Sequence, residues 1–61
     1  MTITLFQKQC KPGTCVYNRV RQEKGTVSRI SKDHDKALVE YGDGSREWNE
    51  YYLLEFHGQK Q

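Results

Sequence analysis

The chain has 61 residues, of which 34% are hydrophobic and 30% are charged, and its net charge is +2 at pH 7. A chain of this length forms one domain with a small core, because it buries only about 60% of the surface that its unfolded state exposes. Little material is left for a dedicated concave pocket, so the length argues against an enzyme. The seven aromatic residues argue against a disordered chain.

The net charge hides an asymmetry between the two halves. Residues 1–31 hold six cations against one acid, whereas residues 32–61 hold four cations against seven acids. If the fold separates these halves, one face attracts anions. No apolar stretch approaches the roughly 20 residues that span a bilayer, and the N-terminus lacks the pattern of a secretory signal. We therefore expect a cytoplasmic protein that does not contact a membrane.

The first third of the chain predicts an N-terminal segment, a turn and a strand. Apolar and polar residues alternate between positions 2 and 7, which favours a short strand or an ordered arm within residues 1–11. Pro12-Gly13 is typical of a turn, because proline presets the first corner and glycine tolerates positive φ. Residues 15–17 then begin a strand, and residues 18–24 form a polar loop.

The middle of the chain predicts two strands that pair across a charged hairpin tip. Gly25 begins the first, and its apolar anchors Val27 and Ile30 are three residues apart, which predicts a bulge near Ser28-Arg29. Residues 32–36 form the solvated tip. Residues 37–41 form the next strand, and we expect Tyr41 to fill the core.

Residues 42–44, Gly-Asp-Gly, predict a tight hairpin that leads into a return strand over residues 45–48. We expect Trp48 to face the core and Asn49 to cap a single helical turn. Residues 53–56 form the fifth strand, and residues 57–61 form a flexible tail. The sequence therefore predicts an all-β fold, with a five-stranded barrel over residues 12–56 and one short helical turn before the last strand.

Four segments of this pattern resemble SH3-like small β-barrels of the Tudor and KOW kind. They are residues 12–17 (Pro-Gly-Thr-Cys-Val-Tyr), 25–30 (Gly-x-Val-x-x-Ile), 39–45 (Val-Glu-Tyr-Gly-Asp-Gly-Ser) and Leu53-Leu54. The Tudor resemblance implies an aromatic cage for methylated lysine or arginine, built from the first and third interstrand loops. The KOW resemblance implies contact with RNA, ribosomal components or the transcription apparatus. Neither loop carries the additional aromatic residue that a cage would use.

Cys10 and Cys15 flank the Pro-Gly turn and leave three alternatives open. They could form a disulfide, although a cytosolic setting keeps thiols reduced. They could bind a metal, but a zinc site needs four ligands, and His34 and His57 lie far apart in the sequence. In the third alternative, one thiol fills the core and the other is partly exposed. We predict no metal and no cofactor.

Two sets of residues are candidates for binding. The first set is aromatic: Tyr51 and Tyr52 are adjacent, so on a helical turn one of them must face solvent, and Tyr17 joins them in a predicted protein-binding surface. The second set is basic and lies along the first hairpin, where Arg19 and Arg21 on alternating strand positions would grip successive phosphates. Lys24 and Arg29 complete this second set.

The leading interpretation is a small non-catalytic binding module, or accessory protein, that docks on a protein partner as a monomer or weak homodimer. The alternative is binding of RNA or DNA through the basic first hairpin. No catalytic constellation is present in the sequence, since Asp33-His34-Asp35 is typical of a charged loop tip rather than of an oriented general base.

Overall fold

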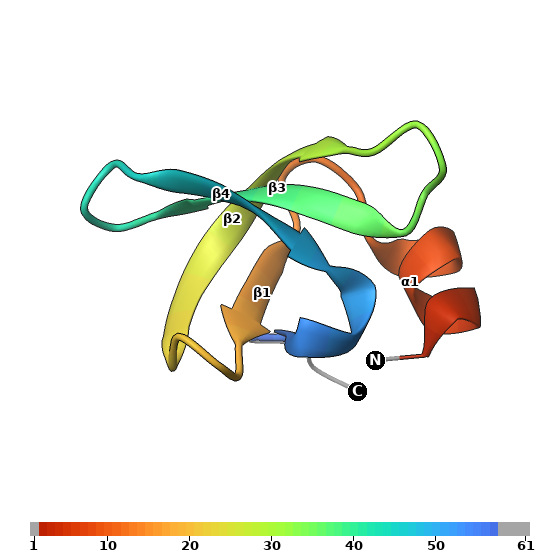
Figure 1. Cartoon of the computed structure of the whole chain (residues 1–61), viewed down its shortest axis with the longest axis horizontal. Coiled ribbons are helices and arrows are strands. Elements are labelled where there is room, and N and C mark those ends of the chain that lie inside the picture. Colours follow the sequence, from red (N-terminus) through yellow and green to blue (C-terminus); the bar gives the residue numbers. More distant parts are fainter. Residues whose placement is uncertain (1, 58–61) are drawn as a thin grey trace.

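The computed structural model describes residues 2–57. They form a five-stranded antiparallel sheet and one short helix, which lies near the N-terminus of the chain (Figure 1). The elements along the chain are α1 (Ile3–Gln9), β1 (Cys15–Asn18), β2 (Glu23–Ile30), β3 (Lys36–Tyr41), β4 (Arg46–Glu50), the 3-10 turn η1 (Tyr51–Leu53) and β5 (Leu54–Phe56). The strand order is β4-β3-β2-β1-β5, which leaves β4 and β5 as the two edges of an open sheet. The prediction of five strands with a helical turn before the last is confirmed.

Residues 3–9 form a helix, so the prediction of a strand or arm at the N-terminus is wrong. The Thr2 side chain caps the helix by accepting a hydrogen bond from the backbone N–H of Leu5 (3.2 Å). The residues that face the core are Ile3, Phe6 and Cys10, whose spacing of three and four residues is the period of a helix. The alternation seen in residues 2–7 was too short to distinguish the two structures.

Helix α1 covers one end of the sheet, beside the β2–β3 turn and η1 (Figure 1). The ring of Phe6 is fully buried, and its centroid lies 6.0 Å from that of Tyr51. The Gln7 side chain donates a hydrogen bond to the carbonyl oxygen of His34 (3.3 Å). The buried core contains Phe6, Cys10, Val16, Val27, Ala37, Val39, Tyr41 and Leu54. The helix therefore supplies part of the core.

Strand β2 bends, and two features of its sequence account for this. The β2–β3 register shifts between Val27 and Arg29, which confirms the predicted bulge. Gly25 lies so close to β3 that a Cβ atom on it would be 2.6 Å from Val39 Cγ1 and 2.7 Å from the carbonyl oxygen of Glu40. Only glycine fits at this crossing, because the second of these atoms is backbone and cannot rotate away.

The β3–β4 hairpin is as tight as predicted. The N–H of Gly44 donates to the carbonyl oxygen of Tyr41 (3.0 Å), and Gly44 has a φ of +88°. A three-residue loop that ends in a left-handed glycine is a common hairpin connection. Gly42, in contrast, is not among the positive-φ residues. The hairpin therefore depends on Gly44 and not on all the residues of the predicted turn.

The prediction that Trp48 faces the core is wrong. Trp48 is 49% exposed, whereas its neighbour Asn49 is only 4% exposed. Asn49 lies opposite the buried Ala37, and Trp48 lies opposite the half-buried Leu38 on the outer face. Asn49 also does not cap η1, because the residue before η1 is Glu50 and it makes no side-chain cap.

The described part of the chain ends just after β5. The N–H of His57 donates to the carbonyl oxygen of Cys15 (3.0 Å), so this residue continues the pairing of β5 with β1. The rest of the predicted tail, residues 58–61, lies outside the described residues. Within residues 2–57, no helix is both long enough and apolar enough to cross a bilayer.

Candidate binding surfaces

Three polar side chains, from β1, β3 and β4, form a buried triangle. The Asn18 amide donates to the hydroxyl oxygen of Tyr41 and to Asn49 Oδ1, and the Asn49 amide donates to the same hydroxyl, each over 2.9 Å. Asn18 Oδ1 also accepts the backbone N–H groups of Val20 and Arg21, both at 2.9 Å. Buried amides are stable only when they are hydrogen-bonded in this way. The triangle therefore fixes the β1–β2 turn against β3 and β4.

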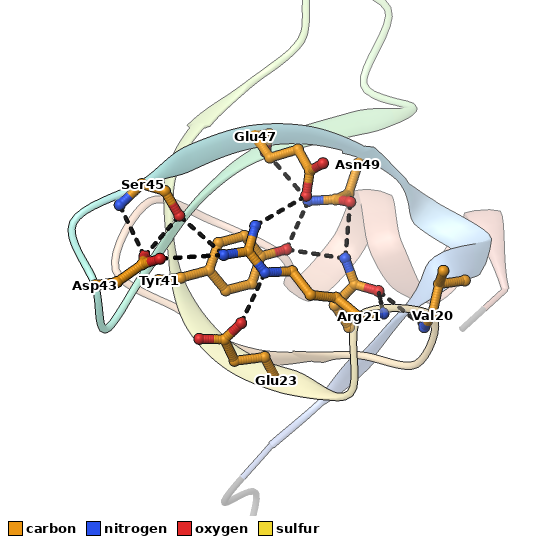
Figure 2. A network of polar contacts seen from close by, with 9 residues as sticks. Val20, Arg21, Glu23, Tyr41, Asp43, Ser45, Glu47 and Asn49 are labelled. Carbon is orange, nitrogen blue, oxygen red and sulfur yellow. Dashed lines mark hydrogen bonds and ion pairs between the residues drawn. The ribbon is translucent and has the colours of Figure 1, made fainter.

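The guanidinium group of Arg21 lies over the ring of Tyr41, with its carbon 3.9 Å from the ring centroid (Figure 2). Its nitrogen atoms lie 2.7 Å from Glu23, 3.4 Å from Glu47 and 3.6 Å from Asp43. The hydrogen bond to Glu23 is the main cause that raises the pKa of Arg21. Because three carboxylates and an aromatic face already surround this cation, Arg21 is not free to bind a phosphate.

The tip of the β3–β4 hairpin is held in place by Asp43 and Ser45. The backbone N–H and the hydroxyl of Ser45 donate to Asp43 Oδ1 at 3.0 and 2.6 Å. These bonds lower the pKa of Asp43, since they stabilise its carboxylate. The Ser45 hydroxyl also accepts a hydrogen bond from Arg21 (2.9 Å), which ties the hairpin to the β1–β2 turn.

Arg19 also interacts with other residues, but these belong to β5 and η1. It lies in the β1–β2 turn, and its Nε is 3.7 Å from a carboxylate oxygen of Glu55. Its guanidinium group donates to the backbone carbonyl oxygen of Tyr52. The predicted alternating strand positions of Arg19 and Arg21 are therefore wrong, because both residues belong to a turn and bind carboxylates on different elements.

The other two predicted basic residues remain accessible. Lys24 and Arg29 lie on β2, are exposed, and form no ion pair with any residue between positions 2 and 57. Lys24 borders a shallow, open cavity of about 550 Å³ that also contacts Cys15 and Glu40. Thus the structure separates the basic set into two neutralised side chains and two free ones.

The two cysteines follow the third of the predicted alternatives. Both thiols are free; Cys10 is buried in the core and Cys15 is exposed. Burial raises the pKa of Cys10 to about 11. Among residues 2–57, no group of three side chains is arranged to hold a metal ion.

The three predicted tyrosines differ in their exposure. Tyr17 is half-buried, and its ring stacks on that of His57 with centroids 6.2 Å apart. Tyr51 is half-buried and packs on Phe6. Only Tyr52 is exposed, at 50%, and its ring meets the edge of Tyr51 with centroids 5.4 Å apart. The expectation that one of the adjacent pair faces solvent is confirmed.

Another exposed apolar residue, Val20, is 74% exposed and lies on a segment next to that of Tyr52. The two residues belong to segments that are bonded together: the N–H of Arg19 donates to the carbonyl oxygen of Leu53 (3.0 Å), and the guanidinium group of Arg19 binds the carbonyl of Tyr52. A hydrogen bond to Glu50 raises the pKa of Tyr52. We call this pair, Val20 and Tyr52, the turn surface.

Trp48 is the exposed residue that the sequence reasoning missed. Its outer-face row continues across the sheet to Leu38 and Arg29. A signal was present in the sequence, because a three-residue loop over 42–44 places the odd-numbered residues of β3 and β4 on the same face. Since Tyr41 and Val39 face inward, Trp48 must face outward.

A comparison of the chain with protein-family models and with curated proteins finds no match.

Proposed function

We propose that the protein is a non-catalytic binding module that docks on a protein partner through the turn surface. The observation that carries this proposal is the exposure of Val20 and Tyr52, at 74% and 50%, on two segments that hydrogen bonds hold together. Exposed tyrosine is enriched at the energetic centres of protein interfaces, where its apolar ring and polar hydroxyl both find partners.

Rigidity of the turn supports the same proposal. The N–H of Val20 is bound by the buried Asn18, and the backbone carbonyl of Tyr52 is bound by Arg19. Binding at preordered side chains costs less conformational entropy than binding at a mobile loop. The turn surface is therefore better suited to a partner than Tyr17 or Tyr51, whose rings already pack within the chain.

We also propose that the fold is an SH3-like barrel of the Tudor or KOW kind. The strand order, the bulge of β2 and the 3-10 turn before β5 support this architecture. Binding of a methylated side chain is not part of the proposal, because Tyr41 is buried and its ring lies under Arg21.

Site-specific cross-linking tests the docking proposal. A benzophenone amino acid at position 52 should give discrete, nuclease-resistant protein adducts in cells, and the same group at the exposed position 40 should not. The partner recovered in this way is then purified for calorimetry. We expect Tyr52→Ala to weaken its binding about tenfold or more, with Glu40→Ala as the matched exposed control. Equal binding by both variants would refute the assignment of the turn surface.

One observation supports the alternative function, which is binding of a nucleic acid. Lys24 and Arg29 are exposed on β2 and have no ion-pair partner within residues 2–57. Titration with single- and double-stranded oligonucleotides at low and high salt tests it, because phosphate contacts give a steep salt dependence. If no amide resonance of β2 shifts at low salt, the alternative is excluded.

A further inference from the structure

The free edge of β4 has backbone groups that no other strand within residues 2–57 uses. In the sheet, β4 pairs only with β3. The N–H of Tyr41 donates to the carbonyl oxygen of Ser45 (2.8 Å), and the N–H of Tyr51 donates to that of Asp35 (3.0 Å). Because hydrogen-bonded pairs alternate along an antiparallel ladder, these two bonds fix its phase. The N–H and C=O groups of residues 46, 48 and 50 therefore point away from β3.

The side chains of the same three residues lie together on the outer face of the sheet. Arg46, Trp48 and Glu50 lie opposite Glu40, Leu38 and Lys36 in the β3–β4 register. Trp48 is 49% exposed. Neither Arg46 nor Glu50 forms an ion pair with any other residue in the 2–57 range. The edge thus presents a cation, a large aromatic ring and an anion in a row.

We propose that β4 pairs with β4 of a second copy of this chain, in an antiparallel register centred on Trp48. A two-fold axis at this residue sets Trp48 against Trp48 of the second copy and Arg46 against Glu50 of the second copy. The three facing pairs then add about four backbone hydrogen bonds, because the carbonyl oxygen of Glu50, at the start of η1, already accepts the first bond of that turn. The contact uses the same patch on both copies, so it closes as a dimer.

Charge selects this register over the others. Parallel pairing would place Arg46 beside Arg46 and Glu50 beside Glu50, and like charges that face each other across strands are destabilising. A shift by one residue would set the free N–H and C=O groups of one copy opposite residues of the other copy whose backbone groups point toward β3. The hydrogen bonds between the two copies could then not form. The opposite edge is less suitable, because β5 has only three residues and its outward acid, Glu55, is paired with Arg19.

This inference does not rest on Val20 or Tyr52, although Glu50 of β4 also accepts a hydrogen bond from Tyr52. The Arg46→Glu variant leaves Glu50 and Tyr52 unchanged and therefore tests the inference separately from the proposed docking function. Dimerisation also adds a property to that function, since a dimer would present two turn surfaces and gain avidity for a partner with two sites. The contact involves five residues in each copy, so the dimer is expected to be weak and concentration-dependent.

Charge reversal in the purified full chain tests the pairing. Sedimentation equilibrium over roughly 10 μM to about 1 mM should show self-association of the wild type. Arg46→Glu alone and Glu50→Arg alone should each abolish it, because each places like charges opposite one another. The double variant, Arg46→Glu with Glu50→Arg, should restore it. Lys32→Glu is the matched control, since Lys32 is exposed in a turn and should leave the association unchanged.

Amide hydrogen exchange provides a second readout that does not depend on the variants. The amides of residues 48 and 50 should become more protected as the concentration rises, whereas those of residues 47 and 49 are already bonded to β3 and should not change. A chain that stays monomeric at every concentration would overturn the proposal. A dimer that the double variant does not rescue, or whose added protection falls on β5, would overturn it as well.

Discussion

Replacement of Phe6 by alanine tests whether α1 is part of the folded core or only an appendage. Phe6 is the one residue of the helix that is fully buried, and it packs on the ring of Tyr51. Alanine has a higher helix propensity than phenylalanine, so the substitution does not weaken the helix itself. Any loss of stability must therefore come from the packing of α1 against the sheet.

The size of the loss follows from burial. Truncation of a buried phenylalanine to alanine costs about 3–5 kcal/mol, because the transfer free energy is lost and a cavity remains. A chain of 61 residues has a total free energy of unfolding of about 3–9 kcal/mol. We therefore expect Phe6→Ala to remove between about a third and all of the free energy of unfolding, and the milder Phe6→Leu to remove about 1 kcal/mol.

Urea denaturation followed by circular dichroism measures both variants. The matched control is Gln9→Ala, an exposed position of the same helix, which should change the free energy of unfolding by less than about 0.5 kcal/mol. A loss below about 1 kcal/mol for Phe6→Ala would mean that the helix is not packed on the core in solution. The reasoning that assigns Phe6 to the core would then be refuted.

Three further predictions concern the sheet, its polar cluster and its thiols. Gly25→Ala should lower the free energy of unfolding in urea by about 1–3 kcal/mol. Gly42→Ala is the control and should be nearly neutral, because a Cβ there meets no atom within 4 Å. Equal effects of the two variants would contradict the close crossing at Gly25. Arg21→Lys should lower the midpoint of urea unfolding, because lysine lacks the planar guanidinium fork; an unchanged midpoint would contradict this prediction. Because burial raises the pKa of Cys10 to about 11, the unfolded chain ionises this thiol more than the folded chain does between pH 9 and about 11. The free energy of unfolding should therefore fall between pH 9 and about 11. Iodoacetamide at pH 8 should label Cys15 before Cys10, and equal labelling of the two thiols would exclude a buried Cys10.

Local patterns were sufficient to predict most of the sheet. The spacing of Val27 and Ile30 indicated the bulge, and Gly44 indicated the hairpin, because both features depend on the conformations of a few neighbouring residues. The first helix was missed because its seven residues are too few for the two periods to be distinguished. Trp48 was misplaced because its face depends on the register across the hairpin, which the sequence reasoning did not count.

The candidate surfaces were harder to predict than the strands. The sequence identified Arg21 as a cation and Tyr52 as an adjacent aromatic residue, but neither observation shows which side chains remain free. Arg21 is neutralised by acids from β2, from β4 and from the hairpin between β3 and β4, and these meet only when the sheet has formed. Charge asymmetry in the sequence therefore overstated the basic character of the first hairpin.

By itself, the sequence determined the number of strands, their turns and the small size of the core, because period-two alternation and turn residues act over short distances. The tertiary structure alone decided which cations are neutralised, whether Tyr51 or Tyr52 faces solvent and which edge of the sheet is free. These properties depend on contacts between residues that are 20 or more positions apart, such as Arg21 with Glu47. Such contacts exist only once the register of every strand has been set.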